Sequence, residues 1–377
     1  MIAKRNGTQP DWEGVNVLVT GGASFIGSHL VDRLVDAGAR VRVADDFSSG
    51  TLENLERSAD AVTIYEGDLR DREFAAAAMA DRQVVFHLAA RHGGRGFIDT
   101  HPADCASNLV LDGTVFDEAW RAGVERVCFA SSACVYPIQR QAREHEQVLL
   151  EEEWADPFAE SGAAADGEYG WAKLMGEMTL RAYGKQHGLK SVSCRIFTAY
   201  GERENETHAV VALIAKAFIG QDPFEIWGDG QQDRNFTYVA DTVEGLMRSA
   251  ARITDGSPVN IGTAEHIRVI DVARLIFELT GFEPAEIAFD LTKPVGVFSR
   301  AAELTRSRAE LAWEPSHGLE EGLRRTIDWY FGTHDRDAVA SRLHALLNER
   351  GPDVVGGAGA NGNGASAAGS SVVAGAA

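Results

Sequence analysis

The sequence predicts an α/β fold: a doubly wound parallel sheet with a smaller C-terminal α/β lobe. Short apolar runs recur over the first half of the chain, and segments with helical spacing separate most of them. A glycine-rich turn follows the first run. Strands that alternate with helices build parallel sheets with right-handed crossovers. At 377 residues, the chain can form one large domain or two fused ones.

The first expected element is the apolar run 15–20, which ends in glycines as a buried strand does. Apolar residues from Ile26 to Val35 then recur at helical spacing and stop before Gly38, so a helix is expected there. A long helix is predicted over 166–187, with Asp166 as its N-cap. The other expected strands of this part are 41–44, 62–65, 84–88, 127–130 and 191–197.

The pattern changes after Ala199. We assign the segments that follow to the smaller lobe: helices near 210–219, 241–251 and 269–279, and short strands such as 224–227 and 259–261. The expected organisation is a flexible leader over 1–13, a sheet domain over 14–198, a mainly separate but interleaved lobe over 199–335, and a disordered Gly/Ala-rich tail over 352–377.

Composition excludes several classes of function. A formal net charge of −20 argues against a nucleic-acid-binding surface. The four cysteines show no C-x-x-C spacing, so no metal site is expected. The first residues lack the apolar segment of a signal peptide, and no apolar run has the length of a membrane span. We therefore expect a cytoplasmic protein with reduced thiols and no membrane partner.

A dinucleotide-binding turn is predicted between the first strand and the first helix. The segment Thr20-Gly21-Gly22-Ala23-Ser24-Phe25-Ile26-Gly27 has G-x-x-G-x-x-G spacing, with Ser24 in place of the middle glycine. Gly21 permits the tight turn and Gly27 permits close packing of helix on strand. The N–H groups at the helix start would hold a pyrophosphate. The motif indicates that the first domain is of the Rossmann type.

The expected cofactor is NAD rather than NADP. Asp45 ends the second strand, where a carboxylate accepts hydrogen bonds from the adenosine ribose and repels a 2′-phosphate. Asp68 and Leu69 follow the third strand and are placed to flank the adenine. Small residues after the fourth strand allow the backbone to approach the cofactor, in the segment Leu88-Ala89-Ala90.

Tyr169 and Lys173 are four residues apart, so they share one face of the long helix. A lysine ammonium there stabilises the phenolate and lowers the tyrosine pKa, and the phenolate can then remove a proton from a substrate hydroxyl. Ser132, at the end of the fifth strand, would hydrogen-bond the same oxygen. This group predicts oxidation of an alcohol with NAD.

The segments TGGASFIGSHL, GDL, FHLAA, SSACVYP and YGWAK resemble the extended short-chain dehydrogenases that act on nucleotide sugars. Within that family, GGRGFI (93–98), ASSACVYP (130–137) and FEIWGDG (224–230) are most similar to the GDP-mannose 3,5-epimerases. The likeness runs from about Val15 to Tyr330. It implies an NAD-dependent nucleotide-sugar epimerase that oxidises C4 of a hexose, exchanges protons at C3 and C5, and reduces C4 again.

The resemblance assigns the base at C3 and C5 to Cys134 and the opposing acid, a lysine in that group, to the position of His208. The sequence departs from the pattern of that group at three further positions. It has Thr198 where the group has an asparagine, Phe298 where the group has one of two arginines near the phosphates, and Arg95 where the group has a methionine. Further cofactor contacts are implied at Phe25, Ile26 and Asn108. Substrate contacts are implied at Gly94, Arg95, Gly96, Ser132, Thr198, Lys216, Trp227, Gln232, Arg234 and Arg300.

Three alternatives remain open. In a simple 4-epimerase the ketosugar turns over, hydride returns to its other face, and Cys134 only lines the wall. A 4,6-dehydratase is disfavoured, because such sites resemble ones with an Asp-Glu pair where Ala133 and Cys134 stand. A non-catalytic NAD-binding protein should lack Ser132, Tyr169 or Lys173. The resemblance further implies a homodimer through the helices 102–123 and 166–187, and favours a GDP-hexose as ligand.

Overall fold

The computed structural model describes residues 11–143, 146–159, 162–348 and 372–373. Within these residues an eight-stranded sheet runs in the order β12-β7-β5-β4-β1-β2-β3-β16. All its strands except β16 are parallel to their neighbours. The strands are β1 (Asn16–Thr20), β2 (Arg40–Asp45), β3 (Val62–Glu66), β4 (Val84–His87), β5 (Arg126–Ser132), β7 (Lys190–Ile196), β12 (Asp255–Ile261) and β16 (Val372–Val373).

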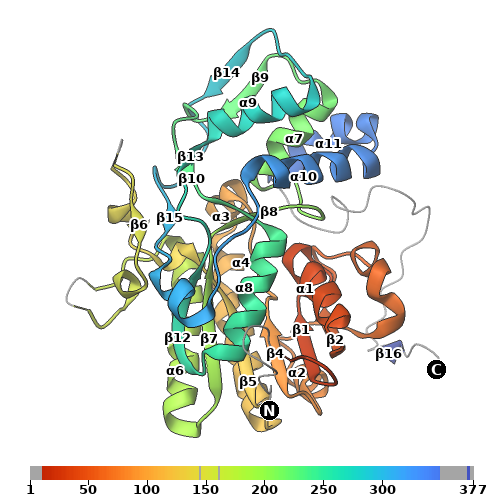
Figure 1. Ribbon diagram of the computed structural model, residues 1–377, viewed down its shortest axis with the longest axis vertical. Helices are drawn as coiled ribbons and strands as arrows, with labels where there is room; N and C mark the ends of the chain where they lie inside the picture. The colour runs from red at the N-terminus through yellow and green to blue at the C-terminus, as the bar shows by residue number, and fades with distance from the viewer. Residues whose placement is uncertain (1–10, 144–145, 160–161, 349–371, 374–377) are drawn as a thin grey trace.

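Helices cover both faces of this sheet, as a parallel sheet requires (Figure 1). Val17 and Val19 of β1 join one core cluster, while Leu18 between them joins the other. The first cluster includes residues of α1 (Phe25–Asp36) and α8 (Val239–Arg252). The second cluster includes residues of α2 (Arg72–Met79), α5 (Asn108–Arg121) and α6 (Gly167–His187).

A smaller lobe lies beyond one end of the sheet, at the top of Figure 1. Its helices are α7 (Ala209–Ile219), α9 (Val269–Thr280), α10 (Leu319–Thr333) and α11 (Arg336–Asn348), and α7 contacts the other three. The strand β9 (Phe224–Trp227) pairs in parallel with β14 (Ile287–Asp290). Short pairs join β8 (Thr198–Tyr200) to β11 (Phe236–Tyr238), β10 (Asp233–Arg234) to β13 (Ile267–Arg268), and β6 (Leu149–Leu150) to β15 (Ala301–Ala302).

The remaining elements are short. Two helices, α3 (Arg95–Thr100) and α4 (Pro102–Ala106), precede α5. The helix predicted over 102–123 is therefore interrupted at Ser107. Tight helical turns are η1 (Glu53–Ala61), η2 (Ala133–Val135), η3 (Ile138–Arg140), η4 (Glu152–Ala155) and the π-helical η5 (Ser307–Leu311). None of the helices in the described part of the chain is long and apolar enough to cross a membrane.

The organisation differs from the prediction in two places. The segment 259–261, assigned to the smaller lobe, lies in β12 at the edge of the main sheet, where Val259 pairs with Cys194 of β7. Its preceding helix, α8, packs on that sheet too. Trp12, predicted to lie in a flexible leader, is 1% exposed, and its ring centre lies 5.6 Å from that of Phe86. The rest of the leader, residues 1–10, and the predicted tail except Val372–Val373 lie outside the described residues.

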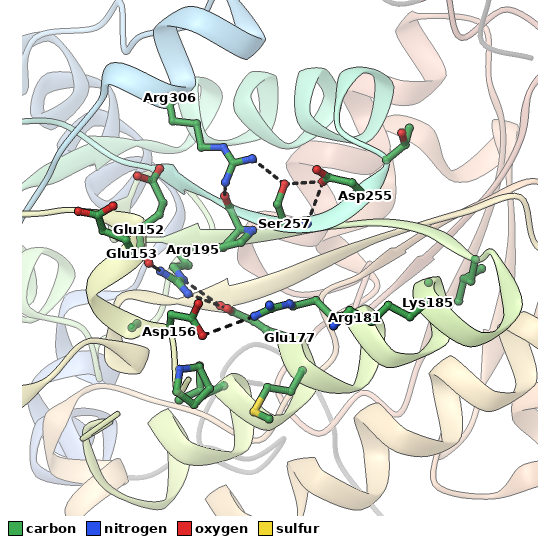
Figure 2. A pocket seen from close by; sticks show the side chains of 18 of the residues that line it. Glu152, Glu153, Asp156, Glu177, Arg181, Lys185, Arg195, Asp255, Ser257 and Arg306 are labelled. Atoms are coloured by element: carbon green, nitrogen blue, oxygen red, sulfur yellow. Dashed lines mark hydrogen bonds and ion pairs between the residues drawn. The ribbon is translucent and has the colours of Figure 1, made fainter. Parts of the chain in front are cut away.

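An ion pair is buried between α6 and β7, as Figure 2 shows. Arg195 Nη2 lies 2.8 Å from Glu177 Oε2, and both side chains are almost inaccessible to solvent. Ser131 donates to Glu177 Oε1 at 2.5 Å, and Arg195 Nη1 donates to the Glu152 carbonyl oxygen at 2.6 Å. The pair lines a cavity of about 560 Å³, and the residues predicted to be catalytic are not part of that lining. We attribute a structural role to the ion pair between Glu177 and Arg195.

Candidate active site

The turn after β1 has the shape that a bound diphosphate needs. Gly21 has a positive φ of 67°, which favours glycine. A Cβ on Gly27 would lie 2.0 Å from the Gly21 carbonyl oxygen, so only glycine allows α1 to approach this closely. The side chain of the N-cap Ser24 makes no capping bond. The first N–H groups of α1 have no partner within the helix and can bind an anion.

The Asp45 carboxylate is held at the end of β2, next to this turn. Its oxygens accept hydrogen bonds from Ala23 N and Phe47 N, each at 2.9 Å. Burial raises the pKa of Asp68, but hydrogen bonds from Arg70 outweigh this effect and lower the pKa overall. A cavity of about 50 Å³ is lined by residues that include Gly21, Ser24, Asp45, Asp68, Leu69, Ala89 and Ala90. This edge of the sheet therefore holds the carboxylates of Asp45 and Asp68 beside the glycine turn.

Asn108 differs from its expected role as a cofactor contact. It is fully buried, and its side-chain oxygen accepts a hydrogen bond from Arg91 N at 2.8 Å. Its side-chain nitrogen donates to the carbonyl oxygens of Arg91 and Cys105, each at 2.9 Å. These bonds go to the backbone, so Asn108 fixes the loop after β4 to the start of α5.

A cavity of about 280 Å³ extends from the glycine turn into the space between the sheet and the smaller lobe. It brings together residues from β5, η2, α6 and the segment before α7. Its lining includes Gly21, Ser24, Phe25, Ile26, Gly27, Leu88, Ala90, Arg95, Ser132, Cys134, Tyr169, Lys173, Thr198, His208, Arg234 and Arg300. The cofactor turn and the predicted catalytic group therefore face one cavity.

Tyr169 and Lys173 are both buried on α6. Burial raises the pKa of Tyr169 above its usual value, and the charges of Cys134 and Asp112 add to this, while a hydrogen bond with Ser132 lowers it. Burial lowers the pKa of Lys173. Lys173 Nζ lies 5.9 Å from the centre of the Tyr169 ring. The sequence predicted a lowered pKa for Tyr169, whereas burial of the phenol, the largest influence on it, raises this pKa.

Cys134 is held against the start of α6. Cys134 N donates to Ser132 Oγ at 3.1 Å, and its carbonyl oxygen accepts from Asp166 N at 2.8 Å. A Cβ on Gly170 would lie 2.2 Å from that carbonyl oxygen, so the glycine after Tyr169 permits this contact. Arg300 Nη1 lies 3.5 Å from Cys134 Sγ and donates to it. The thiol is half-buried, unlike those of Cys105, Cys128 and Cys194.

The cavity lining also includes two imidazoles, those of His92 and His208. His208 is the N-cap residue of α7, and its Nδ1 lies 3.7 Å from Glu204 Oε1. The His92 ring centre lies 6.0 Å from that of His208 and 6.1 Å from that of Tyr169. A group able to carry a proton near neutral pH is therefore present where the resemblance implies the acid.

The cavity carries an excess of cations. Its lining includes Arg95, Lys173, Arg234 and Arg300, against the carboxylates of Asp166 and Glu204. Arg234 donates to the carbonyl oxygens of Asp233 and Val295, at 2.6 and 2.8 Å. Burial, followed by the charge of Arg300, lowers the pKa of Arg234 to about 9. Such a lining suits an anionic ligand.

The sequence predicted that Asp166 caps α6. Asp166 does occupy the N-cap position, but its side chain makes no capping hydrogen bond. Its carboxylate instead pairs with Arg95 and Arg300, at 2.9 and 3.3 Å. Burial raises its pKa, but the two arginines outweigh this and lower the pKa overall. Two guanidinium groups that are far apart in sequence compete with the helix N–H groups for the same carboxylate.

Several predicted substrate contacts are not part of the cavity lining, within the described residues. Lys216 is buried and donates to the Glu225 carbonyl oxygen at 2.8 Å. Gln232 Nε2 donates to the Trp227 carbonyl oxygen at 3.0 Å. A Cβ on Gly94 would lie 1.6 Å from the Thr207 carbonyl oxygen, so the turn 93–96, which includes Gly94 and Gly96, packs against the segment before His208. These residues support the walls of the site.

Sequence reasoning missed His92 and Glu204, and gave Asp166 only a capping role. All of these line the cavity. His92 lies between the end of β4 and the GGRG segment, and Glu204 lies four residues before His208. Both could have been proposed as site residues from the sequence, because each is a titratable side chain close to a segment already assigned to the site.

Comparison with known proteins fits this geometry. A family model described as the NAD dependent epimerase/dehydratase family matches residues 17–262. A GDP-mannose 3,5-epimerase 1 of Oryza sativa subsp. indica is 32% identical over 84% of this chain and 82% of its own length. The chain belongs to the NAD dependent epimerase/dehydratase family.

Solved structures of the epimerase/dehydratase family share the fold. A Thermotoga maritima UDP-glucose 4-epimerase with UDP-glucose has a TM-score of 0.75 and 29% identity, over 85% of this chain and 99% of that one. A Thermus thermophilus UDP-glucose 4-epimerase complexed with NAD has a TM-score of 0.74 and 27% identity, over 85% and 100%. The cofactor is NAD, and the glycine turn with Asp45 fits it: Gly21, Ser24 and the Asp45 carboxylate line one cavity at the end of the sheet, where a dinucleotide's diphosphate and ribose would be held.

Proposed function

We propose that the chain is a nucleotide-sugar epimerase that exchanges protons at C3 and C5 of a hexose, with a GDP-hexose as the favoured substrate. The observation that carries the proposal is the half-buried Cys134 thiol in the same cavity as Ser132, Tyr169 and Lys173. An NAD-dependent oxidation needs only a hydroxyl-activating group, so a thiol beside it suits a second step. Similarity to GDP-mannose 3,5-epimerases supports this proposal.

The first step is removal of a proton from the C4 hydroxyl by Tyr169, with Ser132 donating a hydrogen bond to the same oxygen. NAD held by the glycine turn and Asp45 would supply the hydride acceptor for oxidation at C4 and the hydride for its later reduction. The resulting C4 ketone acidifies the protons on C3 and C5. Cys134 then removes one of these protons, and Ser132 with Tyr169 stabilises the enolate oxygen.

His208 supplies the proton to the opposite face of the enolate carbon, with Glu204 orienting its ring. Arg234, which lines the same cavity, balances the diphosphate of the substrate. His208 stands where the resemblance implies a lysine. Histidine is the side chain that ordinarily gains and loses a proton near neutral pH, which suits this position to the role of the acid.

The test is incubation of the NAD-loaded protein in D2O with GDP-mannose and with a panel of other nucleotide sugars. Magnetic resonance and mass spectrometry then locate deuterium in the recovered sugars. Deuterium at C3 or C5 is the expected result. Unchanged sugars across the panel would contradict the proposal.

A second candidate is a 4-epimerase, and the match to UDP-glucose 4-epimerase structures over nearly their whole length favours it. In that reaction the ketosugar rotates and hydride returns to its other face. Cys134 would then only line the wall. The same experiment separates the two, because inversion at C4 without solvent deuterium identifies the 4-epimerase.

We also propose that two copies associate through α5 and α6. These helices pack against each other and carry large apolar side chains on their outer surface. Leu109 and Val110 of α5 are 50% and 59% exposed, and Trp171 and Met175 of α6 are 43% and 40% exposed. Exposed large apolar side chains on two helices that pack together are typical of an interface between subunits.

A further inference from the structure

The guanidinium of Arg300 places a positive charge next to the sulfur of Cys134. Its Nη1 donates to Cys134 Sγ at 3.5 Å, while its Nε donates to Gln141 Oε1 at 2.6 Å. Its Nη2 donates to Asp166 Oδ2 at 3.3 Å. Arg300 is 9% exposed. The planar guanidinium is therefore fixed on three sides, and one of its edges faces the thiol.

Asp166 is shared between Arg300 and a second arginine. Arg95 Nη1 donates to both Asp166 oxygens, at 2.9 and 3.1 Å. The backbone of Asp166 is itself bound to Cys134, through its N–H and the Cys134 carbonyl oxygen. Paired with Arg300 alone, the Asp166 carboxylate would cancel the charge that faces the sulfur. Arg95 neutralises that carboxylate. Arg95 also pairs with Asp99 on its own helix, but the Asp99 side chain is 32% exposed, so solvent screens its charge more than that of the buried Asp166.

We propose that Arg300 stabilises negative charge on the Cys134 sulfur, and that Arg95 is a positioning residue which leaves this charge available by neutralising Asp166. The substrate contact implied for Arg95 by its place in the GGRG segment is replaced here by a role behind the base. The mechanistic meaning rests on the proposed function of Cys134. The charge arrangement itself does not depend on which sugar is bound.

Other charged groups face the same sulfur and are common to all the variants below. Arg234, from β10, lies close enough to both Arg300 and Cys134 to interact with their charges. The charge of Cys134 also contributes to raising the pKa of Tyr169 and the pKa of Cys105. Burial raises the pKa of Cys105 to about 11, so that thiol reacts slowly near neutral pH. Cys128 and Cys194 are buried.

The test measures alkylation of Cys134 by iodoacetamide near neutral pH in the NAD-loaded protein without substrate. The thiolate sulfur attacks the CH2 carbon, a C–S bond forms, the C–I bond breaks, and iodide leaves. The reagent is neutral, so it is not steered by the local field, and its rate follows the fraction of thiolate. Mass spectrometry of peptides assigns the label to Cys134, with Cys134→Ser as the blank.

We expect Arg300→Gln to slow alkylation about 10-fold, since a charged donor stabilises the thiolate more than the neutral amide that replaces it. Arg95→Met should slow it about 3-fold, because Asp166 then cancels Arg300. Methionine is the residue that the resemblance implies at this position, so the fold should accept it. Adding Asp166→Asn to Arg95→Met removes the unbalanced carboxylate and should restore most of the rate.

Arg324→Met is the matched control, since among the described residues the ion-pair partner of Arg324 is the exposed Glu320 on α10. Alkylation in denaturant, where all variants should react alike, corrects for differences in labelling. A wild-type rate in Arg95→Met, or a double variant as slow as Arg95→Met, would overturn the inference. A third outcome is slower alkylation in the two arginine variants, together with inversion only at C4 by the wild-type protein. That outcome would support the inferred role of the two arginines and reject the proposed function.

Discussion

Ser132, Cys134 and Tyr169 share a cavity because the end of β5 runs directly against the first turn of α6. Gly170 is the residue that permits this approach. The sequence predicted this group because strand end, serine spacing and helix spacing are local features. It did not predict the raised pKa of Tyr169 or the pairing of Asp166 with two arginines. Both depend on burial and on segments distant in sequence.

Tyr169→Phe should abolish oxidation of the sugar. The deprotonated phenol oxygen is the group that removes the C4 proton, and phenylalanine lacks it, so we expect turnover to fall by roughly 10³-fold. Binding of NAD should persist, since the ring remains. Product formation and NAD binding by calorimetry check this. Full activity in the variant would show that another group removes the proton.

Gly27→Ala should lose NAD binding and stability together. Its Cβ would lie 2.0 Å from the Gly21 carbonyl oxygen, so α1 must move away from the turn. Gly332→Ala is the control, because nothing lies within 4 Å of the Cβ it would add. That change in α10 should stabilise by about 0.5–1 kcal/mol. Titration with NAD and thermal unfolding measure both effects, and normal NAD binding in Gly27→Ala would be inconsistent with the model of the turn.

At the scale of elements, most strands and helices were predictable within a few residues, because hydrophobic period identifies them. The assignment of 259–261 to the lobe failed for a topological reason. Period reveals a strand but not its partner, and β12 pairs with β7 about 65 residues earlier in the chain. The prediction that Trp12 lies in a flexible leader was wrong for a related reason. A polar segment gives no sign that its one indole will contact Phe86, which is distant in sequence.

The pair Glu177–Arg195 ties α6 to β7 and should control stability rather than chemistry (Figure 2). Glu177→Gln leaves the Arg195 charge buried without a carboxylate, so the free energy of unfolding should fall by about 3–5 kcal/mol. Glu320→Gln, which breaks an exposed pair on α10, should cost less than about 1 kcal/mol. Urea unfolding compares the two, and equal losses would refute a structural role for the buried pair.

At the scale of the whole molecule, the sheet domain supplies the cofactor turn and the catalytic group, and the segment leading into the lobe supplies His208. Arg234 and Arg300 reach the same cavity from the C-terminal half of the chain. Reaction therefore requires both parts of the chain to be in place. The formal net charge of −20 contrasts with the cationic lining of this cavity, so anionic ligands are attracted there by local charge.

Trp171→Glu should convert a dimer into a monomer, because it places a charge in the apolar surface of α5 and α6. The control is Leu291→Glu, which changes an apolar side chain that is 74% exposed beyond β14. Light scattering after gel filtration gives the mass of each variant. A wild-type protein that is already monomeric at micromolar concentration would reject this interface.

The most direct test of the account compares Cys134→Ala with the wild-type protein during reaction in D2O. NADH absorbance reports oxidation at C4, and deuterium in the sugar reports proton exchange at C3 and C5. We predict that the variant still forms NADH transiently, while its exchange falls by at least ~10²-fold. Undiminished exchange in Cys134→Ala would contradict the assignment of the thiol as the base.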